Sequence, residues 1–390
     1  MTNQEATTTD HLTQYGPQQL NITKDVAELT ADLLDIYSVS GDEKRIADLV
    51  ERALRELGTL EIIRDGNSLI ARTNWGKAQR VVLAGHLDTV PLPSKEGSLG
   101  TVPSHWQEVD GVRTLFGRGA TDMKGGVAVQ LALAAALEDA HYDVTYVFYD
   151  NEEVASHLSG LGRLMKNHRD LLTDAAFAVL LEPTNGTIEG GCNGTMRFWI
   201  HADGLRAHSG RAWMGKNAIH GLADVLNRLH HYEPQTYTVE GLDFREGLNA
   251  VQIQGGVAGN VIPDAASVHI NYRFAPNKTL DEAIAHVQEV FAGYELDFVD
   301  KSSAARPGLD APMSKSLIES VGQEPKPKYG WTDVARFSEI GIPAVNFGPG
   351  DALLAHSDNE HVSADAIHKC YHALYIWLID KKNLSLSDLN

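Results

Sequence analysis

Hydrophobic positions along the chain follow two spacings in turn, which predicts that helices and strands alternate. Apolar residues at helical spacing predict one helix over 25–37, and a second that opens at Ser40 with a Ser-x-x-Glu capping box. Apolar runs predict buried strands over 80–90, 143–149 and 177–181, and a stretch that is almost wholly apolar after Gly126 predicts a buried helix over 124–138. This alternation favours the α/β class, with a mostly parallel sheet covered by helices.

The pattern changes after Gly194 and predicts a second, smaller domain. Between 195 and 303 it predicts strands with two helices, over 217–230 and 280–292, enough for a separate α+β sandwich. The chain then returns to α/β character and ends in a helix that carries Cys370 on its apolar face. The predicted layout is a loose N-terminal extension over 1–23, a main domain over 24–194 and 304–390, and an inserted domain over 195–303.

Charge and cysteine content narrow the functional classes. The chain has 33 basic and 52 acidic residues, a net charge of −19, which disfavours nucleic acid and anionic membranes as partners. No apolar run approaches the length of a membrane span, and no secretory pattern is seen at the N-terminus. Two distant cysteines, Cys192 and Cys370, suit a reducing compartment. We therefore expect a cytoplasmic protein.

Polar side chains follow three of the predicted strands. His86 and Asp88 follow the apolar residues 81–84 of the first, Glu152 and Glu153 come after the second, and Glu182 ends the third. In α/β proteins the carboxyl edge of the sheet is where functional sites gather. Taken singly, His86 could be an ordinary strand-end histidine, and the two adjacent glutamates could be a solvated surface pair.

Two further segments carry candidate chemistry. Asp122 stands in the Gly-rich FGRGATDMKGG, which is neither a dinucleotide nor a Walker motif; helix cap and metal ligand are equal alternatives for it. His356 stands in LLAHSDNEHV near the end of the chain. Apart from Asp88, the segments together offer two histidines and four carboxylates without thiolates. Such a set suits zinc, manganese or cobalt, and its size indicates two ions.

Five motifs, in order and spacing, resemble one known family. GHLDTVP, GRGATDMKGG, DNEEVAS, LLEPT and LAHSDNE are similar to the motifs of the co-catalytic zinc aminoacylases and carboxypeptidases. The resemblance extends over nearly the whole chain from about residue 24 and includes the inserted domain. It implies a zinc-exopeptidase-like main domain, and an inserted domain that acts as a lid and dimerises.

The resemblance also implies roles for individual residues. It makes metal ligands of His86, Asp122 (as the bridging carboxylate), Glu153, Glu182 and His356. It makes Asp88 the residue that orients His86, Glu152 the general base, His208 in RAHSGR the oxyanion donor reaching across a dimer, and Asn260 and Arg273 the binders of a substrate carboxylate. It implies two divalent ions, zinc above all with cobalt or manganese as alternatives, a homodimer, and a cis peptide bond between Asp122 and Met123.

The resemblance is most specific for the substrate in two late segments. Residues 329–337 and 341–362 are most similar to succinyl-diaminopimelate desuccinylases of the actinobacterial type, and Glu182 in place of Asp is unlike the di- and tripeptidases. The implied reaction is hydrolysis of N-succinyl-LL-2,6-diaminopimelate in lysine and diaminopimelate synthesis. The alternatives are an acetylornithine deacetylase or another N-acyl amino-acid hydrolase or carboxypeptidase, and, from another class, a catalytically silent metal-binding relative.

Overall fold

The computed structural model describes residues 12–379, which form two compact units. The first contains the described residues up to Gly190, together with Gly308–Lys326 and those from Ile340 onward; the second contains Gly191–Pro307 and Pro327–Glu339. Each unit has its own hydrophobic core.

The segment Pro327–Glu339 differs from its sequence-based assignment. The sequence places it in the main domain, whereas the structure groups it with the second unit. Hydrogen bonds hold it there: the Asn193 N–H donates to the carbonyl of Lys328 at 3.2 Å, and the Trp331 indole donates to the carbonyl of Ser303 at 3.1 Å.

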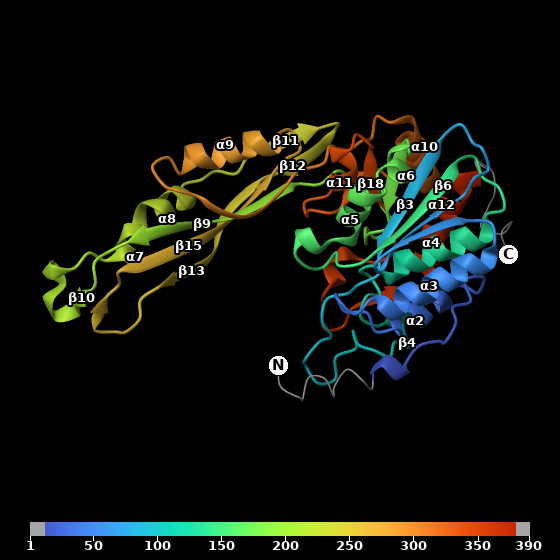
Figure 1. Ribbon diagram of the computed structural model, residues 1–390, viewed down its shortest axis with the longest axis horizontal. Coiled ribbons are helices and arrows are strands. Elements are labelled where there is room, and N and C mark those ends of the chain that lie inside the picture. The colour runs from blue at the N-terminus through green and yellow to red at the C-terminus, as the bar shows by residue number, and fades with distance from the viewer. Residues whose placement is uncertain (1–11, 380–390) are drawn as a thin grey trace. The chain divides into compact units, whose positions relative to one another are not determined.

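The first unit is built on an eight-stranded sheet with the order β1-β2-β6-β3-β7-β18-β8-β17 (Figure 1). Its strands are β1 (Glu61–Asp65), β2 (Ser68–Arg72), β3 (Arg80–His86), β6 (Asp143–Tyr149), β7 (Phe177–Leu180), β8 (Glu189–Gly190), β17 (Lys326–Pro327) and β18 (Ala344–Asn346). The central strands β6, β3, β7 and β18 are parallel, while β1, β2 and β8 pair antiparallel. Every residue of β2, β3 and β6 is buried, so both faces are covered. The predicted α/β class is confirmed.

Helices and a small sheet complete the first unit. The helices are α2 (Val26–Leu34), α3 (Lys44–Leu57), α4 (Lys124–Ala136), α5 (Gly160–Asn167), α6 (Asp170–Thr173), α10 (Pro312–Val321) and α12 (Ala364–Ile379), with short 3-10 turns η1 (Leu12–Gln14), η2 (Ser156–Leu158) and η4 (Ala352–Leu354). The small antiparallel sheet has the order β19 (His361–Ser363), β5 (Val112–Phe116) and β4 (His105–Val109). No helix within residues 12–379 is long and apolar enough to cross a membrane.

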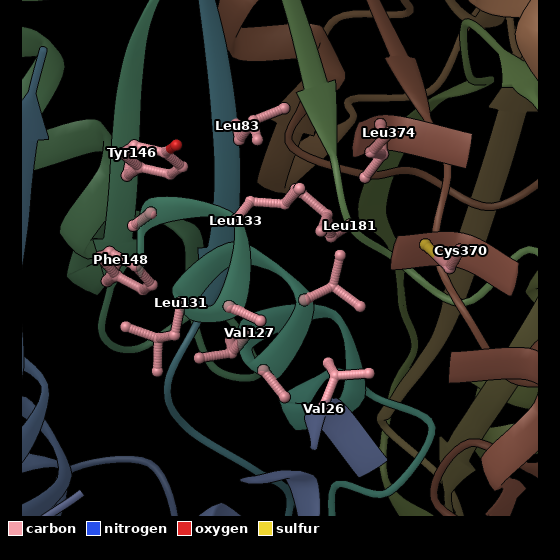
Figure 2. Close-up of a cluster of buried hydrophobic side chains, with 14 of the residues drawn as sticks. Val26, Leu83, Val127, Leu131, Leu133, Tyr146, Phe148, Leu181, Cys370 and Leu374 are labelled. Carbon is pink, nitrogen blue, oxygen red and sulfur yellow. The ribbon is translucent and has the colours of Figure 1, made fainter. Parts of the chain in front are cut away.

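The apolar helix α4 is the centre of the main core. Its side chains gather with those of the sheet, of α12 and of α2, and Figure 2 shows Val127 and Leu133 among Leu83, Leu374 and Val26. Because neighbours surround it, α4 needs no polar face, which explains why its sequence after Lys124 is apolar except for the buried Gln130. It also places the preceding loop at the carboxyl edge of the sheet.

Close packing at the start of α4 makes Gly126 sensitive to substitution. A Cβ at this position would overlap the carbonyl oxygen of Leu181 and lie 2.8 Å from its Cβ. We expect Gly126→Ala to lower the free energy of unfolding by about 1–3 kcal/mol, because overpacking outweighs the helix propensity gained. Denaturant unfolding measures this. Gly330→Ala is the control, because a Cβ there meets only Lys328 Cε at 4.0 Å; an equal loss in both variants would contradict the argument.

Part of the predicted loose extension is packed. Residues 1–11 lie outside the described part of the chain, but in residues 12–23 both Leu20 and Ile22 are buried in the main core. These two isolated apolar residues show no period, so the pattern could not reveal that they dock. The next element, α2, is capped by Asp25, whose side chain accepts the N–H groups of Ala27 and Glu28.

The predicted capping box at Ser40 is wrong. The helix α3 begins at Lys44, and the residue before it, Glu43, makes no side-chain cap bond. Instead the Ser40 hydroxyl donates to the Asp88 carboxylate at 2.7 Å, and Glu43 accepts the Gly41 N–H at 2.7 Å. The hydroxyl that the local pattern assigned to a helix cap binds the side chain of Asp88, which is distant in sequence.

The second unit is an antiparallel sheet with helices packed on one of its faces (Figure 1). The sheet order is β13 (Gly247–Gly255), β15 (Ala265–Phe274), β9 (Gly194–Asp203) and β16 (Asp297–Ser302); the other elements are β10 (Ala207–His208), η3 (Ser209–Met214), α7 (Ala218–Gly221), α8 (Ala223–His230), β11 (Thr236–Val239), β12 (Leu242–Arg245), β14 (Val261–Ile262), α9 (Leu280–Val290) and α11 (Val334–Glu339). Alternate residues of β15 are buried under the helices. The helix predicted over 217–230 is two helices, α7 and α8, that meet at Leu222.

Candidate metal centre

The register of the central strands brings the predicted ligands to one edge. His86 is the last residue of β3 and lies beside Tyr149, the last residue of β6. On the other side of β3, Ala84 lies beside Leu180, the last residue of β7. The segments that follow β6 and β7 therefore leave the sheet next to His86, and these segments carry the three glutamates.

Two groups of donor atoms form at this edge and share one carboxylate. One group is His86, Asp122 and Glu182, and the other is Asp122, Glu153 and His356; within each, the donor atoms lie within 4.8 Å of one another. The Asp122 Oδ1 atom lies 3.1 Å from His86 Nε2, and its Oδ2 atom lies 3.4 Å from His356 Nε2. Asp122 thus presents one oxygen to each group, as a bridging carboxylate would.

Asp122 is not the cap of α4. The helix is preceded by Met123, without a side-chain cap bond, and the peptide bond between Asp122 and Met123 is cis, as the resemblance implied. The capping alternative for Asp122 is therefore wrong, because its carboxylate faces the two histidines instead.

Asp88 organises the loop that carries the two adjacent glutamates. This fully buried carboxylate accepts the N–H groups of Glu152 and Glu153 at 3.0 and 3.1 Å, beside the hydroxyl of Ser40. His86 Nδ1 lies 3.0 Å from the Asp88 carbonyl oxygen and 3.5 Å from its carboxylate. A hydrogen bond on Nδ1 leaves Nε2 as the nitrogen that faces the cluster.

Glu152 lies at the margin of the two groups. Its carboxylate forms a third group with His86 and Glu153, but it is not grouped with Asp122 or His356. This position beside both sets of donors suits a residue that acts on a molecule held between them.

The carboxylates make the site strongly attractive to cations. Hydrogen bonds to Asp122 and Glu153 raise the pKa of His356 to about 10. Burial alone would lower the pKa of His86, but its hydrogen bond to Asp122 and the charges of Asp88 and Glu182 raise that pKa well above its usual value. A donor set of two imidazoles and three carboxylates without thiolates fits zinc, cobalt or manganese.

Sequence reasoning missed two residues that support the site. Glu360 is buried and accepts the backbone N–H groups of Thr121 and Asp122, and Arg118 pairs with it. Arg118 lies in the motif GRGATDMKGG and Glu360 in LAHSDNE, but nothing in the local pattern separates them from ordinary surface charges. Only the fold shows that these two segments meet.

The other predicted site residues lie in the second unit. His208 on β10 pairs with Val261 on β14, and the Ser209 N–H donates to the carbonyl of Asn260 at 2.9 Å. His208 and Asn260 are therefore neighbours. Arg273 lies on β15, in register with Thr195 of β9, at the end remote from Ala265.

Comparison with known proteins identifies the family. The model of Peptidase family M20/M25/M40 matches residues 82–379. The chain belongs to this family. A protein of Mycobacterium tuberculosis (strain ATCC 25618 / H37Rv) named "Putative succinyl-diaminopimelate desuccinylase DapE" is 51% identical over 346 residues, which cover 88% of this chain and 95% of that protein. The succinyl-diaminopimelate desuccinylase of Corynebacterium glutamicum is 44% identical, covering 89% of this chain and 94% of the relative.

Solved structures of the M20 family share the fold. A tripeptidase from Staphylococcus aureus aligns with a TM-score of 0.73 at 18% identity, covering 94% of this chain and 100% of that one. The Bacillus subtilis YXEP protein, described as a dinuclear metal-binding peptidase, aligns with a TM-score of 0.66 at 17% identity, covering 92% and 98%. At this identity the likeness shows the fold alone.

Proposed function

We propose that this M20 protein is a metal-dependent amide hydrolase that removes succinate from N-succinyl-LL-2,6-diaminopimelate. The observation that carries the proposal is identity of 44% and 51%, over about nine-tenths of the chain, to relatives named for that reaction. The donor groups around Asp122 supply a site able to do it. Release of succinate by the zinc-loaded protein tests the proposal, and no release at any metal loading would overturn it.

The metal centre is proposed to hold two divalent ions, zinc by preference. Asp122 would bridge them, with His86 and Glu182 on one side and Glu153 and His356 on the other. Bound there, two such ions lower the pKa of a water molecule and polarise the amide carbonyl of the substrate. The geometry of the donors supports this assignment, because each oxygen of Asp122 faces a different histidine.

Glu152 is proposed to move the proton in this reaction. As general base it takes a proton from the attacking water, and as general acid it delivers that proton to the nitrogen of the breaking C–N bond. Asp88 supports this role by accepting the Glu152 N–H at 3.0 Å, which fixes the loop beside the donors. The products are succinate and the free amine.

Arg273 is proposed to bind a carboxylate of the substrate. Its guanidinium is partly buried on the uncovered face of the sheet, and the structure assigns it no hydrogen bond or close ion pair within residues 12–379. Burial lowers the pKa of Arg273, but the guanidinium stays a cation because the ordinary pKa of arginine lies far above neutral pH. A partly desolvated planar cation of this kind suits bidentate contact with a carboxylate.

His208 and Arg273 are proposed to serve one active site from two copies of the chain. His208 lies beside β14, which leads directly into β15 at Ala265, whereas Arg273 lies eight residues farther along that strand. At about 3.4 Å per residue this is a separation of roughly 27 Å along the strand, too far for both to touch one small substrate. A homodimer resolves the difficulty, because its symmetry brings His208 of one copy towards the other copy.

The edge of the second sheet offers a surface for this dimer. Within residues 12–379, the strand β13 has a partner on one side only, and its residues from Asn249 to Gly255 are all exposed. The apolar residues Val251 and Ile253 on this edge are 57% and 53% exposed. Exposed apolar residues on an open strand edge favour association with another chain. We assign this edge to the proposed homodimer.

A cytoplasmic location is proposed with the function. Cys192 and Cys370 are both buried and unpaired, and burial raises the pKa of the Cys192 thiol to about 11. Two inert thiols without a disulfide are typical of proteins in a reducing compartment.

Arg273→Lys should weaken the preference for succinylated substrates. The succinyl arm carries a free carboxylate that an acetyl group lacks, and an ammonium cannot reproduce the bidentate fork. We expect the ratio of kcat/KM for N-succinyl-LL-2,6-diaminopimelate over N-acetylornithine to fall by about tenfold, with the loss on the succinylated substrate. Arg197→Lys is the control, since Arg197 is paired with Asp300 on the same sheet. An unchanged ratio in Arg273→Lys would remove Arg273 from substrate recognition.

A further inference from the structure

A buried ion pair joins the two segments that carry Asp122 and His356. Arg118 Nη1 donates to the Glu360 carboxylate at 2.8 Å, and the side chains are 3% and 1% exposed. The same Nη1 donates to the carbonyl of Ser357 at 3.1 Å, next to His356 in the chain. The pair therefore lies directly behind the donors rather than among them.

The free oxygen of Glu360 holds the backbone at Asp122. Glu360 Oε1 accepts the N–H groups of Thr121 and Asp122, both at 3.0 Å, while its Oε2 faces Arg118. The Thr121 hydroxyl adds a bond of 2.8 Å to the carbonyl of His361. One carboxylate thus fixes the peptide that carries Asp122 while it is itself anchored to the segment of His356.

This arrangement sets the direction in which Asp122 points. A bridging carboxylate must offer one oxygen to each ion, so a small rotation of the Asp122 backbone would misplace both contacts at once. The Asp122 side chain contacts His86 and His356, which are themselves members of the donor groups and so do not fix its direction independently of the ions. The restraint has to come from the backbone.

We propose that Glu360, anchored by Arg118, is a positioning residue that keeps Asp122 in the orientation needed to bridge two metal ions. Glu360 contacts no ion and no substrate in this role; it acts through the N–H groups of Thr121 and Asp122. The inference rests on the proposed dinuclear centre. In this arrangement, binding of the second ion depends on the ion pair of Arg118 and Glu360 behind the donors.

Glu360→Gln tests the inference through metal binding. The Gln amide offers one carbonyl oxygen in place of two carboxylate oxygens, so it cannot serve the two N–H groups and Arg118 together. We expect the affinity for the weaker-bound zinc ion to fall about 10- to 100-fold, measured by competition with a chromogenic chelator. The visible absorption spectrum of the cobalt-loaded variant should change as well, independently of turnover.

The chain offers a closely matched control at the other end of β6. Asp143 is a buried carboxylate that accepts two backbone N–H groups, of Trp75 and Lys77 at 2.8 and 2.9 Å, and it faces Arg80 at 3.8 Å. Asp143→Asn should lower the melting temperature but leave both zinc affinities and the cobalt spectrum as in the wild type. Equal loss of zinc in Asp143→Asn would show a general stability effect and overturn the inference.

Two further outcomes separate a failure of the role of Glu360 from a failure of the dinuclear centre. Wild-type affinity for both ions in Glu360→Gln would overturn the inference while leaving the metal centre intact. A wild-type protein that binds at most one ion would instead overturn the dinuclear centre itself. If Glu360→Gln does not fold, Glu360→Asp keeps the charge but withdraws the carboxylate by one methylene. It should show a smaller loss of the same ion, and full affinity there would count against the proposal.

Discussion

Glu152→Gln is expected to lose turnover by about 10²- to 10⁴-fold while both metal ions stay bound. The variant keeps the size and polarity of the side chain but cannot accept a proton from water. Glu152 stands outside the two donor groups that share Asp122, so its loss leaves their atoms in place. Kinetics with N-succinyl-LL-2,6-diaminopimelate, together with elemental analysis of the same samples, measure both effects.

The neighbouring residue is the control for this prediction. Glu153 belongs to the group with Asp122 and His356, so Glu153→Gln should weaken one ion as well as turnover. The two glutamates are adjacent, and Asp88 accepts the N–H of each, so the substitutions disturb the loop equally. Loss of an ion in Glu152→Gln but not in Glu153→Gln would show that the two roles are exchanged.

His208→Ala is expected to reduce kcat by about 10²- to 10³-fold, the usual effect of removing one oxyanion donor. The side chain is exposed on β10, and the hydrogen bond that it accepts from the Gly210 N–H at 3.0 Å is local. The stability of the chain and its metal content should therefore be unchanged. His220→Ala, another exposed histidine of the second unit, should have wild-type kinetics.

Mixing two inactive variants tests whether His208 acts across the dimer. A heterodimer of His208→Ala and Glu152→Gln chains has one site with an intact Glu152 and a His208 supplied by the other copy. Random exchange of subunits should then restore about a quarter of wild-type activity, because half of the dimers are mixed and each has one complete site. If His208 serves its own chain, no site is complete and the mixture stays inactive.

The sequence predicts the main-domain strands and the candidate ligands for a single physical reason. A strand buried on both faces has to be continuously apolar, so its end is visible as the first polar residue after the run. The strand predicted over 143–149 is β6 as observed, and His86 is the last residue of β3. Because these strands are parallel, the residues that follow them are predicted to lie at one common edge of the sheet, and the donors meet there.

The features that the sequence could not predict depend on contacts between distant segments. Ser40 has the local pattern of a helix cap, but its hydroxyl bonds to Asp88, 48 residues away. Glu360 resembles a surface acid until the fold buries it against Arg118. Local periodicity contains no information about such partners, so the supporting residues of the site emerge only from the structure.

The most direct test of the account compares two substrates with the zinc-loaded protein. We predict that kcat/KM for N-succinyl-LL-2,6-diaminopimelate exceeds that for N-acetylornithine by at least about 100-fold, since only the succinyl arm offers the carboxylate that Arg273 is proposed to bind. Equal or better hydrolysis of N-acetylornithine would contradict it and would assign the protein to deacetylation instead.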